Sequence, residues 1–449
     1  MEKTKQETVD VAIIGAGFSG IGAAARLRAL GRTFTVLEAR DRVGGRAHTT
    51  PDGVDMGASW VSGEVGNSLF ELARANGIVL SPSVTKTEAI TAFSRAGPLA
   101  DEERARALRC FAEARARADD AAADESASLE ALLTSASVAL GHSAADTAAA
   151  LAVADVAVGS LYASELRDLS GPHHSEPMSE GGEHLVDAGF SAIVACAARE
   201  AGEDAIRLGC PVVRVECRAD GRGVDLLAAS GERVAARAVI CTAPLGVLQA
   251  SARGDATAIA FAPALPERFL ASVLRVGFGN MEKLVGFFER DPFPRSDPCI
   301  CFLDVAGGAG DRRPLCPGRF FTKKFVDGRG VAIVALCTGD ASSAVSRLSE
   351  PEAKEAFLAQ LGLMCGGEEL PVCTAFSRSA WAADAYARGS YSFLAVGARP
   401  EDRDVLREPQ WGGALRFAGE HTQAMNSGYT HGAHSSGAAA ADEVSAFLG

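Results

Sequence analysis

The chain has 449 residues, of which 47% are hydrophobic and 22% are charged, and its formal net charge is −13. This length and composition are enough to bury a large core in two or three domain-sized units. An acidic chain is a poor partner for nucleic acid or for an anionic membrane surface, so both classes of function are disfavoured.

The first segment, Met1–Thr8, has no apolar core of the kind that a signal peptide carries. Eleven cysteines are scattered through the chain without the spacing of a metal site, which predicts reduced thiols, no bound metal and a cytoplasmic protein. The apolar run 144–159 contains Asp146 and Asp155, so we expect no membrane span there, and we also expect no C-terminal membrane anchor.

The first predicted elements form a nucleotide-binding pattern. The apolar run Val9–Ile14 predicts a strand, residues 15–20 (GAGFSG) a glycine turn, and residues 19–30 a helix. A second strand, Phe34–Leu37, ends at Glu38. In this arrangement bare glycine backbone approaches a pyrophosphate, the helix N-terminus faces its charge, and the carboxylate binds a ribose. The pattern therefore predicts dinucleotide binding.

A second glycine loop, Arg42-Val43-Gly44-Gly45-Arg46, follows directly. It offers further backbone N–H groups and fixed positive charge to a pyrophosphate, which nicotinamide enzymes do not need. From Glu38 through this loop the sequence resembles the FAD-binding amine oxidases, the family of monoamine oxidase, polyamine oxidase and the flavin histone demethylases.

Further motifs follow in the order of that family along nearly the whole chain. They are Gly57-Ala58-Ser59-Trp60, residues 180–182 with 189–191, the strand-like runs 212–215 and 238–248, residues 277–283, Trp381 with 389–392, and residues 417–422 with 428–433. The resemblance implies an α/β protein with the two-domain flavin amine oxidase fold. A discontinuous, Rossmann-like FAD-binding domain would span 1–82, 205–262 and 385–449. A mixed sheet-and-helix substrate domain would span 83–204 and 263–384, with helices over about 101–161 and, in the second part, strands at 282–288 and 331–337 and a helix at 352–363.

The resemblance also assigns the residues that hold FAD. These are Gly15, Gly17, Phe18, Ser19, Gly20, Glu38, Ala39, Arg40, Gly44, Gly45, Arg46, Gly57, Ala58, Ser59, Trp60, Val213, Gly419, Glu420, Tyr429 and Thr430. Glu420 would bind the ribityl chain, and the helix that starts near Thr430 would point its positive end at the flavin. An exposed acid at a helix start is the alternative for Glu420.

The catalytic residues that the resemblance implies are Tyr391, Tyr429, Lys283 and Trp381. The two tyrosines would form an aromatic cage that guides a neutral amine to flavin N5, or they are core residues. Lys283 would hold a water on N5 and assist reoxidation by oxygen; strand alternation places it on one face with Val285, but which face is inside is open. Trp381 would pack beside the flavin ring, or simply in the core.

Two departures from the family pattern matter. Ser390 stands where monoamine oxidases have the cysteine that is bonded to the flavin, so we expect non-covalent FAD. Ser62 stands where some polyamine oxidases have the acid that holds the substrate ammonium. The nearest acid is Glu64, which either binds the amine or is a surface glutamate.

The function predicted from the sequence is FAD-dependent oxidation of a C–N bond in an amine. Hydride transfer to flavin N5 would give an imine, and O2 would reoxidise the flavin and give H2O2. The alternatives are an oxidase of an amino acid or of a secondary-metabolite amine or amide, and a non-oxidase flavin protein; a histone demethylase is disfavoured because no chromatin-binding domain or long coiled-coil insertion is seen. The expected partners are a small-molecule amine, O2 and a second copy of the chain in a homodimer.

Overall fold

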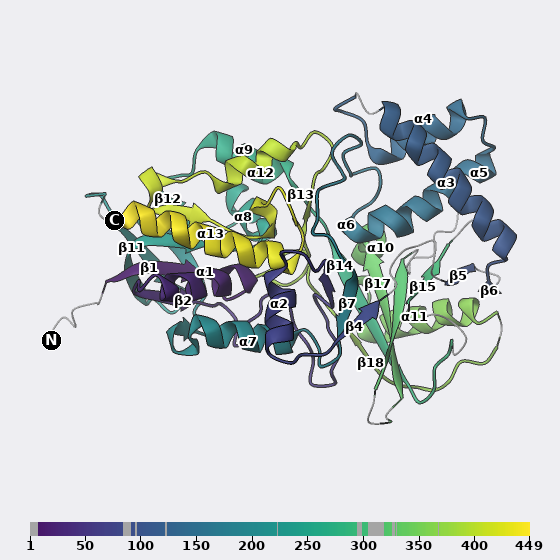
Figure 1. Ribbon diagram of the computed structural model, residues 1–449, viewed down its shortest axis with the longest axis horizontal. Helices are drawn as coiled ribbons and strands as arrows, with labels where there is room; N and C mark the ends of the chain where they lie inside the picture. Colours follow the sequence, from purple (N-terminus) through teal and green to yellow (C-terminus); the bar gives the residue numbers. More distant parts are fainter. Residues whose placement is uncertain are drawn as a thin grey trace.

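The computed structural model describes residues 8–83, 91–94, 97–121, 124–221, 223–293, 299–303, 318–325, 328, 330–366 and 368–449. Two lobes lie side by side in Figure 1. One carries strand β1 (Val9–Ile14) and the C-terminal helix α13 (Thr430–Leu448), and the other carries strands β14 (Met281–Phe288) and β17 (Val331–Thr338).

The sheet of the first lobe has eight strands, in the order β12-β9-β10-β11-β1-β2-β8, and β20 also pairs with β11. Strand β1 runs parallel to both β2 and β11, as the predicted strand–helix–strand unit requires. The other strands are β2 (Phe34–Leu37), β8 (Ile206–Arg207), β9 (Val212–Cys217), β10 (Val224–Ala228), β11 (Arg233–Cys241), β12 (Ala260–Ala262) and β20 (Leu415–Phe417). Three separate stretches of the chain thus build one sheet.

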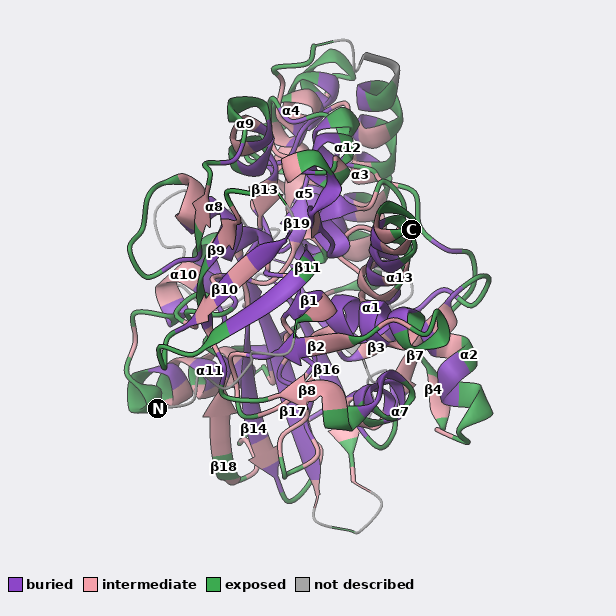
Figure 2. Cartoon of the chain, turned by 90° about the vertical axis from the view of Figure 1, so that its left-hand side faces the viewer, coloured by how far each residue is buried: buried purple, intermediate pink, exposed green. Residues whose placement is uncertain are grey.

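The centre of this sheet is buried on both faces, because parallel strands are covered by helices on either side. Strands β1 and β11 are largely buried in Figure 2. On one face lie α13, α1 (Phe18–Ala29) and α7 (Ser191–Ala201). A Cβ on Gly437 of α13 would lie 1.8 Å from the Ser19 carbonyl oxygen of α1, so only glycine lets these helices approach so closely.

The sheet of the second lobe has seven strands, in the order β18-β14-β17-β16-β15-β5-β6. Phe288, Phe320 and Phe357 are each 1% exposed and pack this sheet against α11 (Glu350–Met364). The predicted strands over 282–288 and 331–337 and the helix over 352–363 are confirmed as β14, β17 and α11. The remaining strands of this sheet are β5 (Thr91–Ser94), β6 (Gly97–Pro98), β15 (Cys299–Phe302), β16 (Arg319–Lys324) and β18 (Cys373–Arg378).

The predicted helical insertion is confirmed as α3 (Asp101–Ala121), α4 (Leu129–Ala139), α5 (Ala144–Ala154) and the short α6 (Ser160–Tyr162). The continuous helical stretch Ala144–Tyr162 is long and apolar enough to cross a membrane by length and composition alone. In the fold 39% of the apolar window of this stretch is buried, and Ala149, Val153 and Val156 pack in a cluster with Ala107 of α3.

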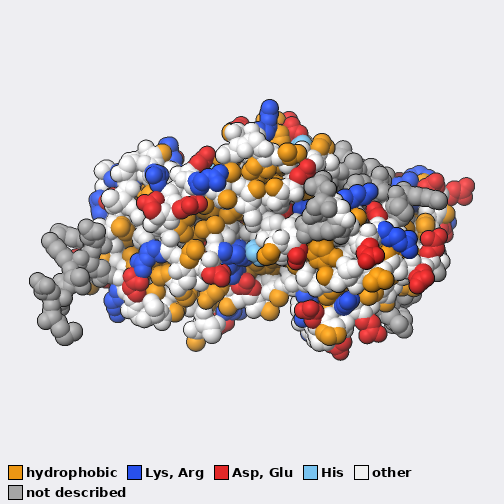
Figure 3. Space-filling model, turned by 90° about the horizontal axis from the view of Figure 1, so that it is seen from below, with side chains coloured by type: hydrophobic (Ala, Val, Ile, Leu, Met, Phe, Trp, Pro, Cys, Tyr) orange, Lys and Arg blue, Asp and Glu red, His pale blue; other side chains and the backbone are white. Residues whose placement is uncertain are grey.

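Smaller elements join the two lobes. Strands β3 (Trp60–Ser62), β7 (Glu183–Val186) and β4 (Leu80–Ser83) form a three-stranded sheet, and β13 (Gly277–Phe278) pairs with β19 (Ser392–Phe393). The other helices are α2 (Ser68–Ala75), α8 (Leu245–Ala252), α9 (Glu267–Arg275), α10 (Gly339–Val345) and α12 (Pro400–Arg407). Figure 3 shows acidic and basic side chains interspersed over the face seen from below.

Candidate active site

A cavity of about 810 Å³ is lined by residues of both lobes. It extends from the glycine turn after β1 to β14 and β16 of the second sheet. Every residue that the sequence predicts for the site lines this cavity except Gly20 and Glu64. Residues that lie hundreds of positions apart in the sequence therefore meet around one space.

Two glycine loops form one end of the cavity. Gly15 has a φ of 95°, and a Cβ on Gly20 would lie 1.8 Å from the Gly15 carbonyl oxygen, so Gly20 closes the turn without lining the cavity. The Gly44 amide donates to the Ala16 carbonyl oxygen at 2.8 Å, which ties the second loop to the first.

Glu38 is 5% exposed and holds the same end in place. Its carboxylate accepts the Ala16 amide at 2.6 Å and the Arg40 amide at 2.8 Å. Each oxygen keeps room for a further hydrogen bond, because a carboxylate oxygen can accept two.

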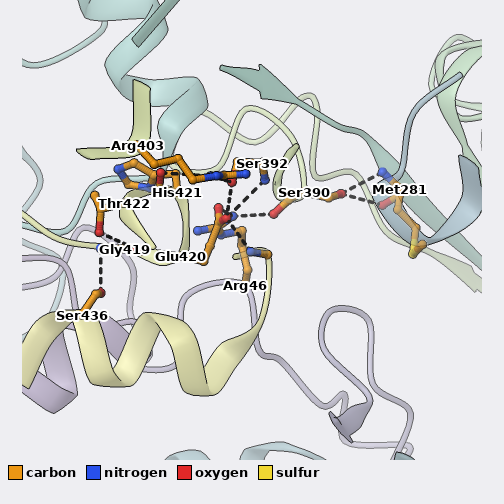
Figure 4. A network of polar contacts seen from close by, with 11 residues as sticks. Arg46, Met281, Ser390, Ser392, Arg403, Gly419, Glu420, His421, Thr422 and Ser436 are labelled. Carbon is orange, nitrogen blue, oxygen red and sulfur yellow. Dashed lines mark hydrogen bonds and ion pairs between the residues drawn. The ribbon is translucent and has the colours of Figure 1, made fainter. Parts of the chain in front are cut away.

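A buried polar network forms the wall of the cavity next to α13 (Figure 4). Glu420 is 3% exposed; it pairs with Arg46 at 3.0 Å and accepts the Ser392 hydroxyl at 2.6 Å and the Gly428 amide at 3.0 Å. Burial disfavours the charged carboxylate, but Arg46 and the surrounding positive groups outweigh burial and lower the pKa of Glu420 to about 2. Glu420 is therefore a carboxylate fixed by the protein.

The network continues behind Glu420. Arg403 is fully buried and donates to the Ser392 hydroxyl at 2.8 Å and to the His421 carbonyl oxygen at 3.0 Å. It also forms a two-pronged ion pair with Glu176, at 2.6 and 2.8 Å. Bidentate pairing of this kind fixes the geometry of the wall.

Lys283 projects from β14 into the cavity wall and is 2% exposed. Its ammonium group donates to the carbonyl oxygens of Asp55 at 2.9 Å and Gly57 at 2.6 Å, and to the Ser59 hydroxyl at 2.6 Å. It also lies 5.6 Å from the ring centre of Phe321. Burial lowers the pKa of Lys283 to about 8.

Aromatic side chains line both ends of the cavity; Tyr386 lies at the glycine end, with the Arg40 guanidinium 5.5 Å from its ring centre. The chain has only four tyrosines, and all four, Tyr162, Tyr386, Tyr391 and Tyr429, line the cavity. Burial raises the pKa of both Tyr391 and Tyr429, so both phenols stay neutral. Trp381 is held by a hydrogen bond from its indole N–H to the Met56 carbonyl oxygen at 2.8 Å.

Glu64 lies outside this cavity. Strand β3 ends at Ser62, Gly63 turns with a φ of 73°, and the Glu64 carboxylate contacts the His184 ring at 2.9 Å. The cavity also contains polar side chains that the sequence patterns did not indicate, among them Tyr162 from α6, Glu176, Glu183 from β7, Arg319 from β16 and Tyr386. No sequence motif marks any of these residues as part of the site.

A glycine cradle at one end of a cavity, with a buried lysine and aromatic rings at the other, defines an enzyme that binds a dinucleotide-type cofactor. The chain belongs to the flavin-containing amine oxidoreductase family, whose model matches residues 18–445. The resemblance seen in the sequence motifs is thereby confirmed, and the chain is an amine oxidoreductase.

Among curated relatives, polyamine oxidase 4 of Oryza sativa subsp. japonica is 29% identical over 456 residues, which cover 96% of this chain and 88% of that one. Lysine-specific histone demethylase 1 homolog 1 of Arabidopsis thaliana is 28% identical, and the match covers 96% of this chain but only 51% of the demethylase homolog.

Two solved structures show the same fold, each with a TM-score of 0.75. Cyclohexylamine oxidase from Brevibacterium oxydans IH-35A is 20% identical, with 98% of this chain and 100% of that chain covered. A putrescine oxidase with redesigned cofactor binding is 21% identical, with 98% and 99% covered. The two-domain flavin amine oxidase fold is thus confirmed.

Proposed function

We propose that this protein is an oxidase of small amines that uses non-covalently bound FAD and O2. The observation that carries the proposal is the single cavity that joins the glycine cradle to Lys283 and the tyrosines. The overall reaction would convert an amine, O2 and water into a carbonyl compound, a released amine or ammonia, and H2O2.

The residues around the glycine cradle fit FAD. A Cβ on Gly17 would meet only the Gly45 Cα, at 4.0 Å, so both loops offer bare backbone to a pyrophosphate. Glu38 has free acceptor capacity for a ribose hydroxyl. The N-terminus of α13 begins at Thr430 in the cavity wall and presents its positive end there.

When bound, FAD would supply the acceptor for the two electrons that leave the amine. The chain's own residues would bind and orient the substrate. Tyr391 and Tyr429 present neutral aromatic rings, which hold an uncharged amine without donating a proton to it. Lys283 holds the Ser59 hydroxyl and the backbone at Asp55 and Gly57 in place through its three hydrogen bonds.

The residue at position 390 supports non-covalent binding of FAD. Ser390 replaces the cysteine of the covalent relatives and cannot form a thioether. Its hydroxyl accepts the Met281 amide at 2.8 Å and donates to the Met281 carbonyl oxygen at 3.1 Å, so β14 holds it in place.

The similarity to the histone demethylase homologs favours a second candidate, oxidation of a methylated lysine amine. One assay separates the two. The purified yellow protein is incubated with alkylamines, diamines, amino acids and a methyl-lysine peptide, and H2O2 is measured for each. We expect peroxide with free small amines; peroxide with the peptide alone would favour the second candidate, and no peroxide with any amine would contradict the oxidase.

A further inference from the structure

Among the residues that the structure describes, four carboxylate side chains line the cavity, and three of them are already held by the protein. Glu38 accepts backbone amides, Glu176 pairs with Arg403, and Glu420 pairs with Arg46. From the described residues the fourth, Glu183, accepts one hydrogen bond, from the Ser62 hydroxyl at 2.8 Å. Within the described part of the chain, Glu183 has no cation within 4.0 Å.

The strand pairing explains why Glu183 faces the cavity beside Ser62. Strands β3 and β7 are antiparallel, and their register sets Ser62 opposite Glu183. Strand β3 starts directly after Ser59, the residue that accepts a hydrogen bond from Lys283. From Ser59 to Ser62 the extended chain spans ~10 Å. Glu183, which lies opposite Ser62, is therefore separated from Lys283 by about this length of strand.

The electrostatics of Glu183 favour a bound cation. Burial raises the pKa of Glu183, although the Ser62 hydrogen bond and the positive charges of Arg319 and His184 act in the opposite direction. A partly buried carboxylate without a close cation is unfavourable, and an ammonium group from a ligand would remove that cost. Besides burial, the charge of Glu183 raises the pKa of Tyr429, so the carboxylate lies within electrostatic reach of the aromatic cage.

Arg319 does not already neutralise this carboxylate. Its side chain comes from β16, is 7% exposed and donates from Nε to the Val156 carbonyl oxygen at 3.2 Å. No ion pair between Arg319 and Glu183 falls within 4.0 Å among the described side chains. Arg319 therefore favours the ionised form of Glu183 from a distance and leaves its oxygens accessible to a ligand.

We propose, building on the amine oxidase function above, that Glu183 and Ser62 form a second cation subsite. In this subsite the Glu183 carboxylate binds the distal ammonium of an aliphatic diamine while the reacting amine lies between Tyr391 and Tyr429. Ser62 orients the carboxylate through its hydroxyl. The preferred substrate class is then a diamine or longer polyamine, and Glu183 is the residue that selects it.

The test compares 1,4-diaminobutane, its mono-N-acetyl derivative and butylamine in anaerobic stopped-flow reduction of the holoenzyme, which separates the Kd from the limiting rate. In the wild type we expect the diamine to bind at least about tenfold more tightly than the other two amines, which lack the distal charge. Glu183→Gln should raise the Kd for the diamine by about tenfold or more, equivalent to about 1.4 kcal/mol. The Kd for butylamine and all limiting rates should stay within about twofold.

Glu64→Gln is the matched control, because it removes a carboxylate near the same sheet but outside the cavity, and it should leave all three Kd values unchanged. Equal effects of Glu183→Gln on diamine and butylamine, or loss of diamine preference in Glu64→Gln, would overturn the subsite. The comparison within the wild type does not depend on the folding of a variant. Equal affinity for the diamine and its N-acetyl derivative would by itself overturn the subsite, while the oxidase function would stand. Failure of all three amines to reduce the flavin would instead contradict the amine oxidase function.

Discussion

Replacement of the buried Lys283 by methionine gives a prediction with a calculable size. Burial lowers the pKa of Lys283 from 10.5 to about 8 in the folded chain. Below about pH 8 the lysine is protonated in both the folded and the unfolded chain, so it adds no pH dependence to the stability. Between about pH 8 and 10.5 only the unfolded chain keeps the proton, so the free energy of unfolding rises with pH through this group.

The full rise corresponds to about 3 kcal/mol, at ~1.4 kcal/mol for each unit of pKa shift. Between about pH 7.5 and 9.5 the wild type should therefore gain about 2 kcal/mol of stability relative to Lys283→Met. Methionine keeps the length and apolar bulk of the side chain but has no proton to lose.

The assay is urea unfolding of the holoprotein at a fixed excess of FAD, measured at several pH values for both proteins. Lys324→Met is the control, because Lys324 lies on β16 of the same sheet with a side chain that is 70% exposed. Its curve should run parallel to that of the wild type. If the free energy of unfolding depends on pH in the same way for the wild type and Lys283→Met across this range, a lowered pKa of the buried Lys283 is refuted.

Two further predictions concern the reacting end and the cofactor. Tyr391→Leu and Tyr429→Leu should each slow flavin reduction by amine roughly tenfold, about 1.4 kcal/mol, with FAD retained, and Tyr→Phe should be milder because the ring remains; a normal reduction rate with loss of FAD would make these tyrosines packing residues. Acid precipitation should leave all yellow colour in the supernatant, because Ser390 cannot form a thioether, and yellow colour in the pellet would contradict non-covalent binding.

The cofactor end could be predicted from the sequence because its rules are local. Gly15 and Gly20 are required by a turn that spans only six residues, and the contact between Gly20 and Gly15 leaves no room for a side chain. Most of the other predicted cavity residues were identified from family motifs, each of which lies within a short segment of the sequence. The limits of the two domains remain a prediction.

The polar contacts of the site could not be predicted, because they join residues far apart in the chain. Arg46 and Glu420 are 374 positions apart, and Ser62 and Glu183 are 121 positions apart. Alternation along β14 could not choose the inner face, since Glu282 and Lys283 are both buried, at 1% and 2% exposure. Both faces of this strand are covered, so its pattern has no polar side.

Glu64 illustrates a further limit of sequence reasoning. It was the acid nearest to Ser62 in the sequence, but the turn at Gly63 directs it to His184. The carboxylate beside Ser62 comes instead from the neighbouring strand, through the register of β3 and β7. Strand register depends on the pairing in the whole sheet and cannot be predicted from the sequence of either segment alone.

The most direct test of amine oxidation is anaerobic titration of the purified holoenzyme with a small primary amine, followed by the absorbance of the flavin. The account predicts that the yellow colour bleaches completely with about one equivalent of oxidised product for each flavin, and that admitting O2 restores the colour with release of H2O2. A flavin that stays yellow with alkylamines, diamines and polyamines alike, while dithionite bleaches it, would contradict the account.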